Sequence, residues 1–323
     1  MRDLCGREID YVRVSITDRC NLRCVYCMPE KGVDAMRHGD MLTYEEIVRT
    51  VRSLASLGIR HVRVTGGEPM ARQGCLDLVE RIHAIPGIEN VSMTTNGLML
   101  AGRVAWAREA GLDALNISLD TLDPDAYRRI TRGGDVTQVM HTMDEALSLG
   151  MRVKVNAVPV RGLNEEGLTA LAALAREHPI QVRFIELMPL GCGAALEPIP
   201  SDEIVAMMTS AFGPMQPDTQ RHGFGPAQYF QPDGFVGSIG VISPMSHAFC
   251  GQCNRVRLTA DGFMKLCLNH TSGLDVRALL RGGADDHTLR SALREAILHK
   301  PLRHGFTEAI GDRESRRMNQ IGG

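Results

Sequence analysis

Apolar and polar residues alternate with a period of two in short segments spread along the first half of the chain. Such alternation is typical of β-strands with one face against a core and the other against water or a cavity. It predicts six strands, at residues 11–17, 61–66, 91–95, 114–120, 151–158 and 181–187. Helical stretches separate them, and Thr43 with Glu46 predicts a capping box at the start of the first helix. Six strand–helix units in series predict a parallel sheet with right-handed crossovers.

The polar residues within these strands favour a barrel over an open sheet. Strands covered by helices on both faces are nearly continuous apolar runs. Here Val12 and Val14 alternate with Arg13, and Val62 alternates with Arg63. An eight-stranded barrel normally fills its interior with branched apolar residues. We therefore expect an α/β fold in which an incomplete (βα)6 TIM-type barrel surrounds a polar cavity.

The strand–helix rhythm ends near residue 189, which predicts a division of the chain. Residues 1–188 are expected to form the partial barrel, and residues 189–323 a C-terminal region that closes the barrel mouth. In this region the pattern predicts a helix at 201–212, a strand at 235–242, a hairpin at 255–259 and 263–267, and helices at 274–280 and 288–299. Residues 213–234, with several Pro and Gly, are expected to be irregular.

Composition excludes some classes of protein. The formal net charge is −2, so there is no overall basic field for nucleic acid or an anionic membrane surface. We expect no nucleic-acid or membrane partner. The first residues lack the apolar stretch of a secretory signal. Nine cysteines in such a chain predict a reducing, cytoplasmic location and metal chemistry instead of a disulfide framework.

Six of the cysteines form two short triplets. They are Cys20-x3-Cys24-x2-Cys27 and Cys250-x2-Cys253-x13-Cys267. Because four-iron clusters are normally held by four Cys, each triplet could hold a [4Fe–4S] cluster with one iron open to another ligand. Zinc is the alternative, and it would need a fourth ligand. Spacing alone leaves the second triplet undecided between a cluster and a closed Cys3His zinc site, because His270 follows it.

Two motifs of the first half resemble those of the radical S-adenosylmethionine (SAM) superfamily. The first triplet has an aromatic residue, Tyr26, before its last Cys, and it follows the first predicted strand. The segment Thr-Gly-Gly-Glu-Pro at 65–69 closes the second strand. Both fall at the C-terminal ends of strands, which is where barrel enzymes place their catalytic groups.

The resemblance narrows to one family, the GTP 3′,8-cyclase (MoaA) family of molybdenum cofactor biosynthesis. It rests on segments spread over nearly the whole chain. These are residues 13–18 (RVSITD), 94–97 (TTNG), 116–120 (NISLD), 184–189 (FIELMP), the second triplet with 254–257 (NRVR), and the C-terminal Gly-Gly.

The resemblance implies the cofactors and the site residues. The first triplet would hold a [4Fe–4S] cluster whose open iron chelates SAM, and the second triplet a [4Fe–4S] cluster whose open iron faces guanine. Implied SAM contacts are Tyr26, Gly67, Ser118 and Met188. Implied GTP contacts are Arg13, Arg63, Thr94, Lys154, Arg255, Val256 and Arg257. Of these, Arg13, Arg63, Thr94 and Lys154 fall on the predicted polar face by alternation alone. Gly322 and Gly323 are implied to enter the active-site pocket.

The implied reaction converts GTP to (8S)-3′,8-cyclo-7,8-dihydroguanosine 5′-triphosphate, the first step of molybdopterin synthesis. A 5′-deoxyadenosyl radical takes hydrogen from ribose C3′, and the resulting carbon radical attacks guanine C8 before a further reduction. The resemblance also implies a cellular one-electron donor and hand-off of the product to cyclic pyranopterin monophosphate synthase. Monomer and homodimer both stay open.

Two rival functions remain at this point. A peptide-modifying radical SAM enzyme would share the first triplet and the barrel, but it needs a groove for a peptide in place of cations for a triphosphate. A zinc-dependent nucleic-acid-binding protein would use the triplets structurally. Its expected basic excess is absent from a chain of charge −2.

Overall fold

A single mixed sheet forms the centre of the computed structural model, which describes residues 1–306 and 314–322. The six predicted strands are confirmed and lie side by side, parallel and in chain order. They are β1 (Tyr11–Ser15), β2 (His61–Thr65), β3 (Asn90–Thr95), β4 (Ala114–Ser118), β5 (Arg152–Ala157) and β6 (Gln181–Ile185).

The C-terminal region extends the sheet at both edges. Strand β10 (Arg255–Leu258) pairs in parallel with β1, and β9 (Ser238–Ile242) pairs in parallel with β6. Antiparallel strands then follow on each side: β11 (Phe263–Lys265) and β12 (Gly273–Asp275) beyond β10, and β8 (Gln228–Gln231) and β7 (Gln216–Asp218) beyond β9. The partial barrel with a C-terminal extension is therefore confirmed, and the extension flanks the six strands.

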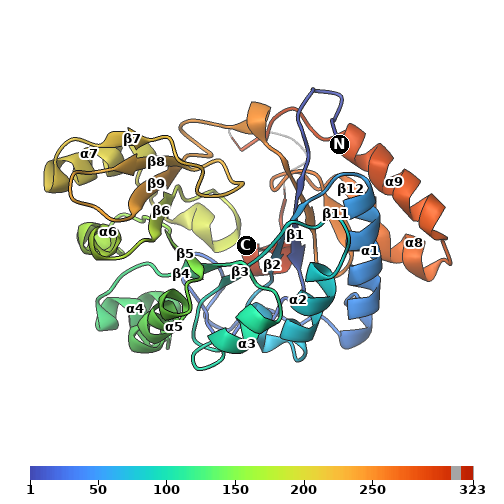
Figure 1. Ribbon diagram of the computed structural model, residues 1–323, viewed down its shortest axis with the longest axis horizontal. Helices are drawn as coiled ribbons and strands as arrows, with labels where there is room; N and C mark the ends of the chain where they lie inside the picture. The colour runs from blue at the N-terminus through green and yellow to red at the C-terminus, as the bar shows by residue number, and fades with distance from the viewer. Residues whose placement is uncertain (307–313, 323) are drawn as a thin grey trace.

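Helices cover the outer face of the sheet, with α1, α8 and α9 on one side and α4 to α6 on the other (Figure 1). The capping box predicted for α1 is present, since Glu46 N–H donates to Thr43 Oγ1 at 3.2 Å and Thr43 N–H donates to Glu46 Oε2 at 2.7 Å. In the part of the chain that is described, no helix is long and apolar enough to cross a membrane. The helices are α1 (Tyr44–Ser56), α2 (Cys75–His83), α3 (Val104–Glu109), α4 (Pro124–Thr131), α5 (Val136–Ser148), α6 (Leu168–Glu177), α7 (Ser201–Phe212), α8 (Val276–Arg281), α9 (Asp286–Leu298) and α10 (Met318–Ile321).

The alternation in the strands separates an apolar outer face from a polar inner face. Val12, Val14 and Val62 have no exposed surface and belong to the main hydrophobic core under the helices. Arg13 on β1 lies in register with Arg63 on β2, and both are on the opposite face. The inner face is therefore a polar lumen, as the period of two predicts.

The sequence prediction was wrong for residues 213–234, which were expected to be irregular. They contain β7 and β8, which pair with each other and, through β8, with β9. Each is only three or four residues long. Strands this short give no periodic signal, and their stability comes from pairing with the sheet.

Replacing Gly237 by Ala is expected to destabilise the fold. A Cβ atom there would lie 2.1 Å from the Ile180 carbonyl oxygen and 2.7 Å from the His178 carbonyl oxygen, both backbone atoms. Relieving this overlap requires a shift of β9 against β6, at a cost of about 1–3 kcal/mol. Urea unfolding of the two proteins measures the difference.

Gly225→Ala is the matched control. A Cβ atom at Gly225 meets nothing within 4 Å, and we expect a change within about 0.5 kcal/mol. Equal stability of Gly237→Ala and the unsubstituted protein would show that β9 does not approach β6 this closely.

Candidate active site

The first cysteine triplet lies in the loop after β1, at the C-terminal ends of the parallel strands. Burial raises the pKa of the Cys24 thiol, and Asp120, Cys27 and Cys20 raise it further. Burial also raises the pKa of Cys27 to about 12, with Cys20 contributing. The three sulfurs are thus close enough to disfavour each other's ionisation. A positively charged metal centre would remove that penalty, because thiolates are the form that binds metal.

Three Cys thiols are a donor set that fits an iron–sulfur cluster. Within residues 1–306 and 314–322, no three His, Cys, Asp or Glu side chains are grouped closely enough to ligate one ion. A zinc ion draws each sulfur to about 2.3 Å from one centre. In an iron–sulfur cubane each thiolate binds a different iron, so three thiols would leave one iron without a protein ligand.

Close backbone contact fixes the first cysteine loop against the end of β2. Gly67 N–H donates to the Thr17 carbonyl at 2.7 Å, and Glu68 N–H donates to the Arg19 carbonyl at 2.8 Å. A Cβ atom on Gly67 would lie 2.3 Å from the Arg19 carbonyl oxygen. The Gly-Gly pair after β2 is therefore required by this approach.

Glu68 connects the loop after β2 to the loop after β3. It is 1% exposed, and its carboxylate accepts hydrogen bonds from Thr95 Oγ1 at 2.8 Å and Asn96 N–H at 2.7 Å. Burial raises its pKa to about 7. Asn96 in turn donates to Asn21 Oδ1 at 2.8 Å, beside Cys20. The sequence analysis included Glu68 in the motif at 65–69 and Asn96 in the motif at 94–97, but it predicted no role for either residue.

Asp120 holds Tyr26, one of the predicted SAM contacts. Tyr26 donates its phenol proton to Asp120 Oδ2 at 2.7 Å, and Val158 N–H donates to Oδ1 at 2.9 Å. Burial raises the pKa of Asp120 to about 6. Ser118, another predicted SAM contact, ends β4 two residues before Asp120. Tyr26, Gly67 and Ser118 therefore all lie on the loops or strand ends around the first triplet.

The C-terminal tail reaches the same end of the lumen, because Gly322 lies beside Ser15 and Thr65, the last residues of β1 and β2. In Figure 1 the C mark lies among the strands of the sheet. Gly322 has a φ of +77°, and a Cβ atom there would lie 2.8 Å from Ser15 Cβ and 2.9 Å from Thr65 Oγ1. Its carbonyl accepts a hydrogen bond from Arg257 Nη1 at 2.7 Å. Met188 packs in a small apolar cluster with Ile321 of the tail. Gly323 lies outside the described residues.

The second triplet lies at the other end of the strands. Cys253 lies two residues before β10, and Cys267 lies two residues after the antiparallel β11. Burial alone would raise the pKa of Cys253, but Lys300 and Arg255 outweigh it and hold the pKa at about 7. His270, the zinc ligand considered above, has Nε2 at 3.0 Å from the Arg303 carbonyl oxygen. That nitrogen therefore already has a protein partner.

Arginines line the lumen between the two triplets. Arg257 on β10, Arg13 on β1 and Arg63 on β2 lie at one register level across three neighbouring strands. Burial lowers the pKa of Arg13 well below its ordinary value, and Arg257 and Arg63 lower it further. Buried guanidinium groups that repel one another form a site for a multiply charged anion, whose binding would offset the repulsion.

A hydrogen-bonded polar row continues across the other strands. Arg183 on β6 donates from Nε to Asn156 Oδ1 at 2.8 Å and from Nη2 to Asn116 Oδ1 at 2.6 Å. Lys154 on β5 donates to the His222 carbonyl. Burial lowers its pKa to about 6, with Arg183 and Arg63 contributing. The sequence analysis predicted no role for Arg183. Its position within the predicted strand at 181–187 was the only signal that could have identified it.

The structure brings most of the predicted GTP contacts into the lumen, with one exception. Thr94 lies in register with Asn116, which is itself in register with Lys154. Val256 lies in register with Val12, is 1% exposed and belongs to the apolar core. Its side chain therefore faces the helices, so only its backbone could approach a ligand.

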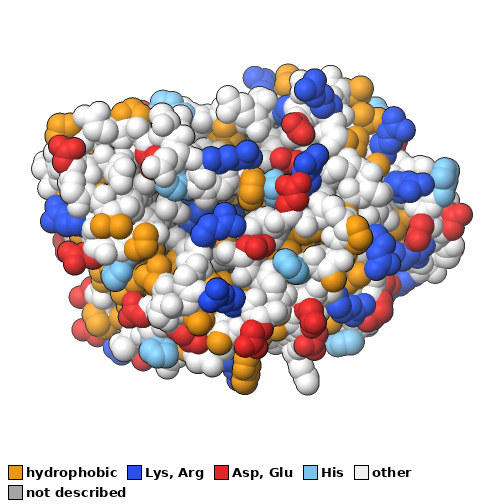
Figure 2. All heavy atoms as spheres, in the orientation of Figure 1, with side chains coloured by type: hydrophobic (Ala, Val, Ile, Leu, Met, Phe, Trp, Pro, Cys, Tyr) orange, Lys and Arg blue, Asp and Glu red, His pale blue; other side chains and the backbone are white. Residues whose placement is uncertain are grey.

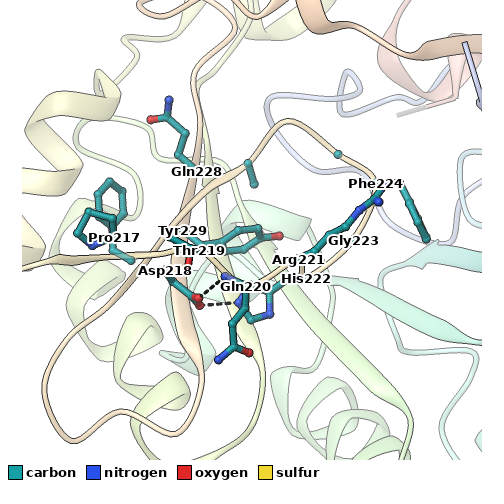
Figure 3. A pocket seen from close by; sticks show the side chains of 13 residues that line it. Pro217, Asp218, Thr219, Gln220, Arg221, His222, Gly223, Phe224, Gln228 and Tyr229 are labelled. Carbon is teal, nitrogen blue, oxygen red and sulfur yellow. Dashed lines mark hydrogen bonds and ion pairs between the residues drawn. The ribbon is translucent and has the colours of Figure 1, made fainter. Parts of the chain in front are cut away.

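The connection between β7 and β8 lies over the N-terminal ends of the strands, an arrangement that sequence reasoning missed. Asp218 contacts His222 and the Gln220 backbone N–H (Figure 3). Phe224 stacks on His61 of β2 with ring centroids 3.4 Å apart. This connection lines a cavity of about 600 Å³. On the face shown in Figure 2, basic and acidic side chains are interspersed.

Tyr26→Phe is expected to destabilise the reduced, metal-free chain more at pH 8 than at pH 5. Asp120 is ionised at pH 8, and a hydrogen bond to a charged group contributes about 1.5–3 kcal/mol. At pH 5, below its pKa of about 6, Asp120 is protonated and a neutral bond contributes about 0.5–1.5 kcal/mol. Urea unfolding at the two pH values measures both.

Tyr44→Phe is the control, because Tyr44 donates to the neutral Gln73 carbonyl at 2.8 Å in an exposed place. Its cost should be the same at both pH values. A Tyr26→Phe cost that is also independent of pH would contradict the assignment of an ionised Asp120 as its partner.

Comparison with known proteins agrees with this arrangement along the whole chain. Residues 14–175 match the family model described as the radical SAM superfamily, and residues 180–306 match the model described as Molybdenum Cofactor Synthesis C. The superfamily implies a [4Fe–4S] cluster and SAM as cofactors. Among solved structures, SuiB of Streptococcus suis bound to its precursor peptide is similar with a TM-score of 0.63 at 13% identity, over 92% of this chain and 66% of that chain. This likeness shows the fold alone.

Curated relatives match from end to end. The GTP 3′,8-cyclase of Pelotomaculum thermopropionicum is 45% identical, that of Moorella thermoacetica 44% and that of Clostridium perfringens strain 13 42%, each over 100% of both chains. These matches cover the full length of each chain, so they span both cysteine triplets and the strands between them. The chain therefore belongs to the GTP 3′,8-cyclase family of the radical SAM superfamily.

Proposed function

We propose that this protein converts GTP to (8S)-3′,8-cyclo-7,8-dihydroguanosine 5′-triphosphate in molybdenum cofactor biosynthesis. One observation carries the proposal beyond family membership. The two cysteine triplets lie at opposite ends of the strands of one sheet, and the lumen between them is lined by buried arginines. A substrate held there would contact a cluster at each end.

We assign one [4Fe–4S] cluster and SAM to Cys20, Cys24 and Cys27, and a second [4Fe–4S] cluster to Cys250, Cys253 and Cys267. The chemistry that the first cluster supplies when bound is a one-electron reduction of SAM, which yields methionine and a 5′-deoxyadenosyl radical. Residues 1–188 would then carry the radical-generating part and residues 189–323 the second cluster. The separation of the trios keeps SAM and the nucleotide base at different ends of the lumen.

The buried cations bind and orient the triphosphate. Arg13, Arg63 and Arg257 present planar guanidinium groups that match phosphate oxygens. The net reaction removes hydrogen from ribose C3′, forms a C3′–C8 bond, and adds one electron and one proton to the purine. None of these changes touches the triphosphate, so its contacts serve orientation. Holding the reacting atoms in line can contribute about 7–11 kcal/mol of barrier lowering.

Gly322 would form part of the wall next to the substrate. Its carbonyl accepts from Arg257, and there is no room for a Cβ beside Ser15 and Thr65. The electron donor, the recipient of the product and the oligomeric state stay predictions from the family resemblance.

Anaerobically reconstituted protein with SAM, dithionite and GTP tests the proposed function directly. We expect one 5′-deoxyadenosine for each cyclised nucleotide. Replacing GTP by peptides tests the rival peptide-modifying activity. Formation of 5′-deoxyadenosine without loss of GTP would overturn the substrate assignment.

Metal content of cysteine variants tests the two clusters. Because each triplet is assigned a separate cluster, Cys24→Ala and Cys253→Ala should each lower bound iron and sulfide to about half, and the double variant should bind almost none. Cys75→Ala is the control, since Cys75 is buried in the apolar core at the start of α2 and belongs to neither triplet. Stoichiometric zinc at the second triplet would contradict the assignment.

Binding of GTP is expected to take up a proton at Lys154. Its pKa of about 6 in the free protein leaves it mostly neutral at pH 7.5, and a neighbouring phosphate favours its charged form. Uptake should therefore approach about one proton per GTP, and affinity should fall as pH rises above 6. Calorimetry in buffers of different ionisation enthalpy measures this uptake.

Lys154→Met should abolish most of the proton uptake and flatten the pH dependence of GTP affinity between pH 6 and 8. Arg290→Met is the control, because Arg290 is exposed on α9, whereas the charges that lower the pKa of Lys154 after burial are Arg183, Arg63 and Arg152. Equal proton uptake by the Lys154→Met variant and the unsubstituted protein would show that another group takes the proton.

A further inference from the structure

A buried ion cluster joins the last described segment of the chain to β11. The side chains of Lys265 and Glu314 are 0% and 1% exposed, and Lys265 Nζ donates to a Glu314 carboxylate oxygen. Arg316 donates from Nε to Glu314 Oε1 and from Nη2 to Oε2, each at 3.1 Å. Its Nη1 lies 3.5 Å from Asp261 Oδ2. Asp261, Lys265, Glu314 and Arg316 are called the tail latch below.

The tail latch also holds the loop that carries Cys267. Glu314 N–H donates to the Asn269 carbonyl at 2.6 Å, and Lys265 Nζ donates to the His270 carbonyl. Burial alone would raise the pKa of Glu314, but hydrogen bonds from Arg316 and Lys265 hold it at about 2. The carboxylate is thus ionised and fully engaged.

Residues beyond the tail latch reach the first cysteine loop and the lumen. Asn319 Nδ2 donates to the Asp18 carbonyl at 3.0 Å, and the Asn319 backbone N–H lies against the Cys27 sulfur. Three residues later, Gly322 meets Arg257. The short stretch from Glu314 to Gly322 therefore spans from the second triplet's loop to the first.

We propose that Glu314 and Lys265 are positioning residues, which set where the tail enters the lumen and so place the Gly322 carbonyl against Arg257. A buried ion pair is generally no more stabilising than apolar residues of similar size, so its use here points to fixing one arrangement. Lys265 also lies opposite Arg257 in the antiparallel pairing of β11 with β10, so the pair borders the lumen arginines as well as holding the tail. The consequence for turnover rests on the proposed function, whereas the consequence for the tail does not.

Hydrogen exchange of the reconstituted protein, followed by mass spectrometry, tests the tail. In Glu314→Gln and in Lys265→Met, amides of residues 314–322 should exchange at least about tenfold faster. Residues 16–28, which Asn319 of the tail contacts at Asp18 and Cys27, should also exchange faster, whereas α1 should be unchanged. Glu45→Gln is the control, since it removes an exposed ion pair with Arg81 and should change none of these.

Steady-state kinetics tests the consequence for turnover. We expect kcat to fall at least about tenfold, with KM for GTP within about threefold and iron content unchanged. Unchanged tail exchange in both variants would overturn the proposal. A uniform rise in exchange across the molecule, or a parallel loss of iron, would show a merely structural role and overturn it too. If the unsubstituted protein does not cyclise GTP, the proposed function fails, and tail exchange still decides whether the latch positions the tail.

Discussion

Like charges buried at close range are the constraint on which this molecule depends. Burial lowers the pKa of Arg13, and Arg257 and Arg63 on the neighbouring strands lower it further. Burial raises the pKa of Cys24, and Asp120, Cys27 and Cys20 raise it further. Either group would be costly to ionise alone in a low-dielectric interior. The free-energy cost of ionising each group is offset when a ligand of opposite charge binds. The electrostatics of the chain therefore indicate a metal centre at the thiols and a polyanion in the lumen.

Two buried carboxylates keep the loops around the first triplet in place. Glu68 joins the loops after β2 and β3, and Asp120 joins Tyr26 to the backbone after β5. Neither has a close cationic partner among its hydrogen bonds. Each relies on N–H and O–H donors, which keeps the carboxylate geometry fixed without adding a counter-charge beside the cysteines. The negative charge of the cysteine thiolates is thus left to be balanced by the bound ligands.

Much of the fold and part of the site could be predicted from the sequence because the relevant signals are local. Alternation in β1 and β2 located Arg13 and Arg63 on the inner face, and spacing identified both triplets. The strands β7, β8 and β12 were missed because three or four residues carry no usable period. Glu314 was missed because its partner Lys265 lies 49 residues away, beyond any local pattern. Val256 shows the opposite error. It was a predicted GTP contact because it belongs to the motif at 254–257, but its side chain faces the apolar core.

The pairing of β10 with β1 has a consequence for how the protein is made. Tyr11 lies opposite Arg255, so the N-terminal strand leaves the ribosome long before its neighbour. Until then one side of β1 presents unpaired backbone groups, which are a template for aggregation. Contacts this distant in the chain also slow folding. A nascent chain that ends before β10 should therefore depend on chaperones, and C-terminal truncations should be recovered mainly as insoluble protein.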